Sequence, residues 1–333
     1  MNMRPRALGL AAAVAALVLT AAGCGGKQHD QHDQADKGAG GGRITIATGN
    51  TTGVYYQLGG GLGKLISDNI EGYRATATAT GGSVQNIQGV VAGDYDIGFS
   101  LLDTAGDAVR GKGSFTTRQP VEALARLYPN YTQVVVRADS GIKSLADMKG
   151  KRISTGAPGS GTEVIAKRLL AAGGLDMNKD VRAQRLQLPE TVDAMKDGTV
   201  DGLFWSGGVP TAGITDLTTT LGGKVRFLDI TPQLSALRKE YGDVYRRGTI
   251  PASAYKQPGD IPTVIVPNVL LVKKGFDPEL AKKITNVLFD HQSNLEQVNP
   301  AAKEISASDA PNTTPLPLNP GAKAALANRT VMA

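Results

Sequence analysis

The chain of 333 residues contains 42 glycines, 17 prolines, three histidines and one cysteine. Its length suits two lobes or domains, and its 41% hydrophobic and 20% charged residues exclude global disorder. The single cysteine excludes a disulfide framework and a cysteine-based zinc finger, and three histidines argue against a histidine-dependent catalytic triad. A formal net charge of +6 would alone suggest a nucleic-acid-binding protein, but the N-terminal residues point elsewhere.

The N-terminus has the pattern of a bacterial lipoprotein signal peptide. Arg4 and Arg6 precede an uncharged apolar stretch over residues 7–23, and small residues then lead directly into Cys24. We therefore predict a signal peptide over 1–23 and a lipid chain on Cys24, which would anchor the protein outside the bacterial cell membrane. An uncleaved transmembrane anchor is the alternative, although the apolar stretch is short for a span.

Residues 24–42 are predicted to be the lipidated cysteine and a flexible tether. This segment has no apolar periodicity and consists mainly of Gly, Gln, Asp and Lys, so it cannot bury enough surface to offset its chain entropy. His29 and His32, each followed by an aspartate, are a weak metal-binding candidate. A solvated spacer is the favoured interpretation, and we predict no metal and no cofactor.

The rest of the chain repeats one plan twice. Each copy reads strand, glycine-rich loop, helix, strand, helix, Gly/Asp turn and strand. The spacing from Arg43 to Asp96 is 53 residues, and the spacing from Arg152 to Asp201 is 49. Two β-α-β-α-β units predict two α/β lobes with mostly parallel sheets. The predicted strands are 43–48, 73–78, 96–100, 152–156, 183–188 and 201–205, with helices around 58–66, 84–92, 165–170 and 190–196.

The chain is predicted to cross between the lobes twice. Strands at 124–128 and 132–137 are separated by Pro129-Asn130, which we expect to break the strand. The return begins at the strand-like residues 262–273. This assigns 43–130 plus 261–333 to lobe I and 131–260 to lobe II, with a hinge and a cleft between them. Further predicted elements are a strand at 225–230 and helices at 233–241 and 278–294.

The expected site lies in this cleft, because ligands of open α/β sheets sit beyond the carboxyl ends of the strands. The loops there are rich in Gly, Ser and Thr, and helix N-termini with free amides attract anions. Ser83, Ser160 and Thr162 could add hydroxyl donors. The alternative for each loop is plain turn and capping chemistry. The four loops are 49–53, 80–83, 156–162 and 205–208.

The candidate enzyme motifs in the sequence are incomplete, so we predict a protein that is not an enzyme. Residues 59–64 (GGGLGK) lack the first Gly and the Ser/Thr of a phosphate loop and fall within a predicted helix. The segment around Ser160 lacks the first Gly of a nucleophile elbow, and the sequence offers no suitable histidine to activate this serine. Either Tyr55 or Tyr56 is expected to face the ligand, and Trp205 is either an aromatic lid or a core residue. The aspartates at the Gly/Asp turns are taken as turn residues, namely Asp94, Asp96, Asp197 and Asp201.

Residues 127–170, with GAPGSGTE at 156–163, resemble the TAXI family of solute-binding components of tripartite ATP-independent periplasmic (TRAP) transporters. Shorter segments that also resemble the family are 49–56, 80–86, 208–211, 250–251, 262–271, 291–302 and 315–322. The resemblance implies a two-lobed periplasmic-binding-protein fold of type II and a small organic anion as ligand, such as a glutamate-like amino acid or a dicarboxylic acid. It further implies delivery to a TRAP permease.

The resemblance also implies ligand-contacting residues. By matching motif these are Tyr55 or Tyr56, Ser83, Asn86, Gly159, Ser160, Gly161 and Thr162, and the strand-end loops add Thr52 and Trp205 as predicted contacts. Leu101 stands where the family commonly has Gln, and Trp205 where it often has Phe. These two departures put glutamate in doubt as the ligand but have little effect on the expectation that a carboxylate binds.

The predicted mechanism is closure about the hinge, because contacts to both lobes exist only in the closed state. The expected protein is a monomer that does not bind nucleic acid. Two alternatives remain open: a sensory binding protein that signals to a membrane receptor, and an enzyme built on the same fold.

Overall fold

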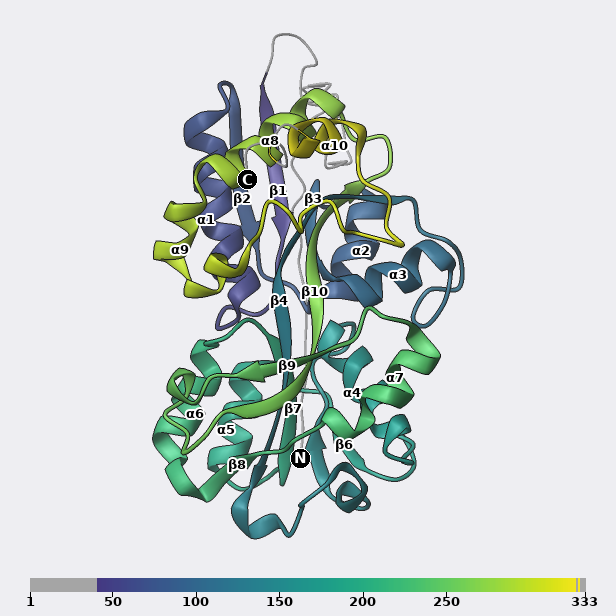
Figure 1. Ribbon diagram of the computed structural model, residues 1–333, viewed down its shortest axis with the longest axis vertical. Coiled ribbons are helices and arrows are strands. Elements are labelled where there is room, and N and C mark those ends of the chain that lie inside the picture. Colours follow the sequence, from purple (N-terminus) through teal and green to yellow (C-terminus); the bar gives the residue numbers. More distant parts are fainter. Residues whose placement is uncertain (1–40, 328, 330–333) are drawn as a thin grey trace, which may run out of the picture. The chain divides into compact units, whose positions relative to one another are not determined.

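The computed structural model describes residues 41–327 and 329, so the predicted signal peptide, Cys24 and most of the tether lie outside the described residues. Gly42 is already the first residue of a strand, which shortens the predicted tether by one residue. No helix in the described part of the chain has the length and apolarity to cross a membrane. The fold is a mixed α/β structure of two lobes (Figure 1).

Lobe I begins with the first β-α-β-α-β unit. Its three strands pair in parallel in the order β2-β1-β3. Helix α1 forms because Leu58, Leu62 and Ile66 recur on one face, and that face is buried against the sheet. The predicted GGGLGK segment lies inside α1, as expected. The elements are β1 (Gly42–Ala47), α1 (Val54–Asn69), β2 (Tyr73–Thr78), α2 (Ser83–Ala92), β3 (Ile97–Leu101) and α3 (Leu102–Arg110).

Lobe II contains the second unit, with parallel strands in the order β7-β5-β6. The repeat extends to single side chains. Asp96 accepts the backbone N–H of Thr45 at 2.7 Å, and Asp201 accepts that of Arg152 at 2.8 Å, at matching positions of the two units. The elements are β5 (Arg152–Ser154), α4 (Gly161–Ala172), β6 (Arg182–Gln184), α5 (Leu188–Lys196), β7 (Gly202–Gly207) and α6 (Ala212–Leu221).

Two long antiparallel strands, β4 (Val121–Arg137) and β10 (Ile261–Lys273), run through both lobes and join the two halves of the sheet (Figure 1). The prediction that Pro129-Asn130 ends a strand is wrong. Pro129 lies opposite Pro267, so two residues that cannot donate face each other, and the register shifts just beyond them. The strand therefore continues where a proline normally interrupts one.

The remaining elements complete both lobes. Strand β8 pairs with β4, and β9 pairs with β10. The predicted helix at 278–294 is two helices that meet at His291. The elements are β8 (Val225–Phe227), α7 (Leu234–Tyr241), β9 (Arg246–Ile250), α8 (Pro278–Asp290), α9 (Gln292–Val298) and α10 (Pro320–Ala327). Short 3-10 turns cover Ala138–Ser140, Leu145–Met148, Gly222–Lys224, Thr231–Gln233, Ala252–Ala254 and Pro300–Glu304.

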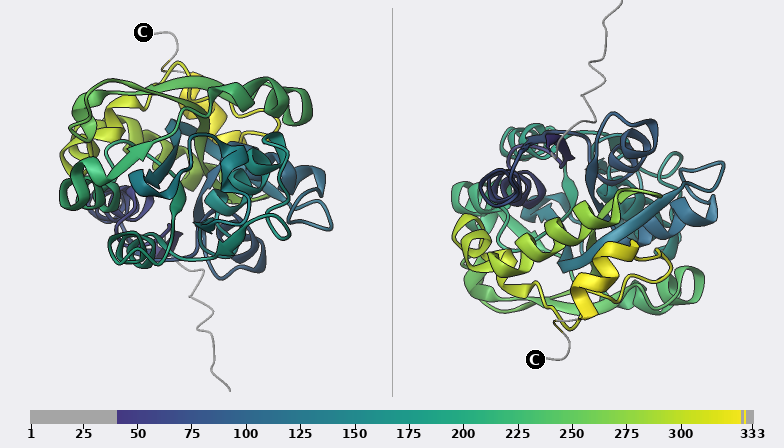
Figure 2. Two further views of the ribbon diagram at one scale, coloured as in Figure 1. Left: turned by 90° about the horizontal axis from the view of Figure 1, so that it is seen from below. Right: turned by 90° about the horizontal axis from the view of Figure 1, so that it is seen from above.

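Helices cover the sheet on both faces in each lobe (Figure 2). Lobe I buries one core under α1 and α8, and a second under α2 and α3. Lobe II buries one core under α4 and α7, and another under α5 and α6. The predicted strands at 183–188 and 225–230 shorten to three residues each, and α3, α6, α10 and β9 were not predicted. This arrangement directs the strand ends of both lobes at each other. The residue limits of the two lobes stay a prediction.

Candidate binding site between the lobes

The helix N-termini of α2 and α4 meet across the two lobes. A Cβ placed on Gly161 would lie 2.5 Å from Leu101 Cδ1 and 2.6 Å from Ser83 Oγ. A Cβ on Gly82, whose φ of +116° suits glycine, would lie 3.6 Å from Ser160 Cα. Gly161 has no room for a side chain, and the two lobes are in contact at these helix N-termini.

Some of the predicted anion-binding donors are already occupied. The carbonyl of Gly159 in lobe II accepts the N–H groups of Val84 at 3.0 Å and Gln85 at 3.2 Å in lobe I. The hydroxyl of Ser160 caps its own helix by accepting the N–H of Glu163 at 3.0 Å. Ser160 is thus the N-cap of α4, and the first turn of α2 bonds to the opposite lobe.

A chain of hydrogen bonds runs from lobe I through the crossing strands into lobe II. Tyr55 Oη donates to Asn268 Oδ1 at 2.6 Å, and Asn130 Nδ2 donates to the same oxygen at 3.2 Å. Asn130 Oδ1 in turn accepts the hydroxyl of Ser206, whose backbone N–H donates to Thr162 Oγ1 at 3.2 Å. The structure thus brings together Tyr55 and Thr162, two predicted site residues 107 positions apart.

Sequence reasoning missed Asn130, Asn268 and Ser206. The signal that could have found them is the dipeptide Pro-Asn, which occurs at the matching point of both crossing strands, at 129–130 and 267–268. Because proline removes a backbone donor there, the asparagine side chains supply hydrogen bonds in its place. Asn268 Nδ2, for example, donates to the carbonyl of Tyr128 at 2.9 Å.

The structure distinguishes the two tyrosines. Tyr55 points inward and packs on Phe99 with ring centroids 5.1 Å apart, whereas Tyr56 is 36% exposed. Burial raises the pKa of Tyr55 far above its usual value, with the Ser83 hydroxyl acting in the opposite direction and Asp103 adding to the rise. The Tyr55 hydroxyl therefore stays protonated and acts as a hydrogen-bond donor.

Asn86, Thr52 and Trp205 occupy different positions relative to the cleft. Asn86 is fully buried and donates to the carbonyls of Thr48 at 2.6 Å and Phe99 at 2.8 Å, so it holds lobe I together. Thr52 donates to Asn50 Oδ1 at 3.0 Å. Trp205 Nε1 donates to Thr211 at 3.0 Å, and its ring edge lies 3.5 Å from a Cβ placed on Gly53. Trp205 thus reaches the start of α1 while half-buried.

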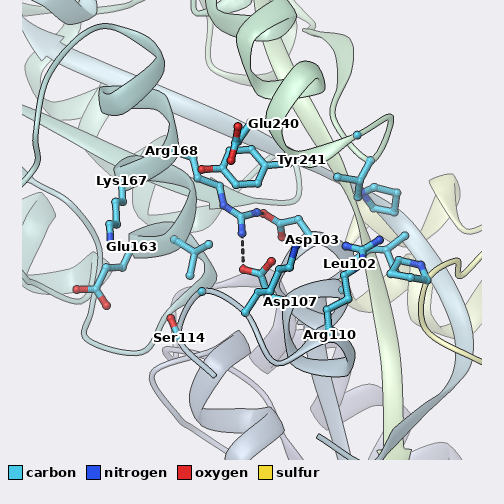
Figure 3. Close-up of a pocket in the computed structure, with 18 of the residues that line it drawn as sticks. Leu102, Asp103, Asp107, Arg110, Ser114, Glu163, Lys167, Arg168, Glu240 and Tyr241 are labelled. Carbon is cyan, nitrogen blue, oxygen red and sulfur yellow. Dashed lines mark hydrogen bonds and ion pairs between the residues drawn. The ribbon is translucent and has the colours of Figure 1, made fainter. Parts of the chain in front are cut away.

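A buried ion-pair network also joins the lobes (Figure 3). Arg168 on α4 donates to Asp103 Oδ2 at 2.9 Å and bonds to Asp107, both on α3. Tyr245 bonds to Asp103 and accepts from Arg168 at 2.9 Å, and the Arg168 guanidinium lies 4.0 Å from the Tyr241 ring centroid. Burial raises the pKa of Asp107, while Arg168 acts to lower it. We call these residues the α3–α4 ion-pair network.

Within the described residues, no group of three His, Cys, Asp or Glu side chains could hold a metal ion. The Tyr55–Thr162 chain presents neutral hydrogen-bonding groups, and the α3–α4 network presents charges that already balance in part. Both sets of contacts bridge the two lobes.

The family model described as the NMT1-like family matches residues 46–327. The chain belongs to the NMT1-like family. Three solved structures share its fold, each with a TM-score of 0.54. A protein from Bordetella bronchiseptica RB50 is 21% identical, with 86% of this chain and 88% of that one covered. The binding protein component of an ABC phosphonate transporter from Pseudomonas aeruginosa is 15% identical, with 80% and 82% covered. PhnD1 from Prochlorococcus marinus, in complex with methylphosphonate, is 11% identical, with 79% and 92% covered.

These comparisons confirm the predicted two-lobed fold of the periplasmic-binding-protein type. They correct the family. The TAXI assignment is wrong, because the model that matches is the NMT1-like one and the named transport proteins with this fold are of the ABC type. The most diagnostic motif behind the assignment, GAPGSGTE at 156–163, is a Gly/Ser/Thr loop at a strand end, which the fold needs where helices of two lobes meet closely. The expected TRAP permease partner and the expected carboxylate ligand lose their support together with the TAXI assignment.

Proposed function

We propose that this chain is an extracytoplasmic solute-binding protein that closes on a small molecule and delivers it to a membrane transporter of the ABC type. The NMT1-like family and the fold shared with an ABC phosphonate-binding component support this proposal. The observation that carries it is the hydrogen bonding from Tyr55 through Asn268 and Asn130 to Ser206, which couples a lobe I helix to lobe II through the crossing strands.

The proposed mechanism is a shift of population toward the closed state. A ligand between the lobes contacts both surfaces only when they are closed, so its differential affinity favours that state. The chain performs no chemistry on the ligand. The lipid on Cys24 would keep the protein at the membrane beside its transporter, as the N-terminal pattern predicts.

The test of binding is a ligand screen by calorimetry on the full-length chain, with phosphonates, sulfonates and amino acids. Gly161→Ala should weaken any ligand found by about tenfold or more, because the new methyl group would meet Leu101 and Ser83 at 2.5–2.6 Å and oppose closure. Gly60→Ala is the matched control, since a Cβ there meets nothing within 4 Å. A ligand bound equally by all three proteins would contradict binding by closure.

Delivery needs a separate assay. Uptake of the ligand should require this chain, continue when the membrane ion gradient is collapsed with ATP maintained, and stop when ATP is depleted. Uptake that instead follows the ion gradient would contradict an ABC-type transporter.

A further inference from the structure

A large charged cleft opens beside the α3–α4 ion-pair network (Figure 3). Its volume is about 1180 Å³, and it is lined by α3 in lobe I, α4 and α7 in lobe II, and residues near Thr314. None of Tyr55, Asn130, Asn268 or Ser206 lines it. The cleft is therefore separate from the hydrogen-bond chain described above, and it draws its walls from both lobes.

The charges that line this cleft do not balance. Asp103 and Asp107 pair with Arg168, Glu163 pairs with Arg185, and Asp243 pairs with an arginine outside the lining. Glu240 is then the one acidic lining residue without an ion pair within 4.0 Å among the described residues. Five basic residues of the lining are without such a pair in the same part of the chain: Arg110, Lys112, Arg126, Lys167 and Arg246.

Arg126 is the most unusual of these cations. It is half-buried on β4, and its buried Nε has no hydrogen-bond partner in the described structure. Its backbone N–H bonds to Ala310, which fixes the base of the side chain. Burial lowers the pKa of Arg126, Asp309 acts to raise it, and repulsion from Arg246 lowers it further. Arg126 and Arg246 both line the cleft, and neither has an acidic group within 4.0 Å among the described residues.

We infer that this cleft is a binding site for a multiply charged oxyanion, with Arg126 and Arg246 as its principal contacts. The planar guanidinium donors suit phosphate or carboxylate oxygens in a bidentate arrangement. The oxyanion would give the Nε of Arg126 its acceptor and neutralise the repulsion between the two arginines. Because Arg110 and Lys112 belong to lobe I and Lys167 to lobe II, the bound anion also favours the closed state.

The experiment is isothermal calorimetry of the full-length chain with inorganic pyrophosphate and, separately, citrate, with sucrose as the uncharged probe. Pyrophosphate, citrate or both should bind, and the affinity should fall as salt is added. Arg126→Gln should lower the affinity by about tenfold or more, the loss expected for a charge-assisted contact. Arg246→Gln, on an exposed strand position, should lower it in the same direction and keeps the test valid if Arg126→Gln fails to fold.

Lys283→Gln on α8 is the matched control, because it removes one exposed positive charge away from the cleft. It should leave the anion affinity unchanged. The inference is overturned if neither anion binds at about 1 mM, or if Lys283→Gln weakens binding as much as Arg246→Gln does. The Arg126 and Arg246 variants separate this cleft from the solute site, since neither residue belongs to the hydrogen-bond chain from Tyr55 to Thr162.

Discussion

At the scale of single residues, one aspartate in each β-α-β-α-β unit fixes the register of two neighbouring strands. Asp96 and Asp201 were predicted to be turn residues, and both do follow turns. Each also accepts a backbone N–H from the neighbouring parallel strand, and Asp201 accepts Nε of Arg152 at 3.1 Å as well. A carboxylate at this point ties the start of one strand to the start of the next, which sets the register that Gly/Asp turn chemistry alone leaves open.

Asp201 makes stability depend on pH. The side-chain hydrogen bond from Arg152 holds the pKa of Asp201 below its usual value of 3.8, although desolvation acts in the opposite direction. The stabilisation is therefore fully present above pH 3.8 and is lost as pH falls through the lower, folded-state pKa. Asp201→Asn should lower the free energy of unfolding at neutral pH, and the difference from the natural chain should vanish in strong acid.

Urea unfolding at a series of pH values measures this effect. Asp197→Asn, at an exposed position in the same turn, is the control and should change little. If Asp201→Asn costs the same stability at every pH, the contribution is not electrostatic.

At the scale of elements, helix α1 shows how glycine serves packing at one position and not at its neighbour. A Cβ on Gly59 would lie 2.4 Å from Thr48 Cγ2, so this glycine lets the helix approach β1 closely. Gly60 faces solvent, and a Cβ there meets nothing within 4 Å. The glycine run looked like an imperfect phosphate loop, but its role is helix–sheet contact.

Gly60→Ala should stabilise the protein by about 0.5–1 kcal/mol, because alanine loses less backbone entropy in a helix. Gly59→Ala should destabilise it by about 1–3 kcal/mol through overpacking. Thermal unfolding of the two variants measures whether each one is more or less stable than the natural chain. A shift in the same direction for both would show that close packing does not govern this face.

At the scale of the whole molecule, the α3–α4 ion-pair network links lobe I to lobe II. Its three charges are all at least 89% buried in their side chains, so removing one partner leaves the others uncompensated. The network joins segments 65 and 61 residues apart along the chain. It therefore sets part of the balance between open and closed states.

Arg168→Met should lower the free energy of unfolding by about 3–5 kcal/mol, since two buried carboxylates lose their counter-ion. It should also increase the radius of gyration in small-angle scattering without ligand, because the lobes lose a cross-link. Lys239→Met on α7 removes an exposed charge and serves as the control. If the radius of gyration is unchanged while the stability falls, the network contributes to stability and not to the closure of the lobes.

The sequence by itself determined the two β-α-β-α-β units, most helix positions and the glycine-rich strand ends. Periodicity and turn chemistry act over a few residues and are legible in the chain. Only the tertiary structure decided that β4 continues through Pro129, that Tyr55 rather than Tyr56 points inward, and that Asn130 and Asn268 meet. These outcomes depend on contacts between segments far apart along the chain, and the repeated Pro-Asn dipeptide is the one local sign of them. The family error has a related cause, because the glycine-rich loop that weighed most in the resemblance reflects what the fold needs at a strand end and does not identify the transporter.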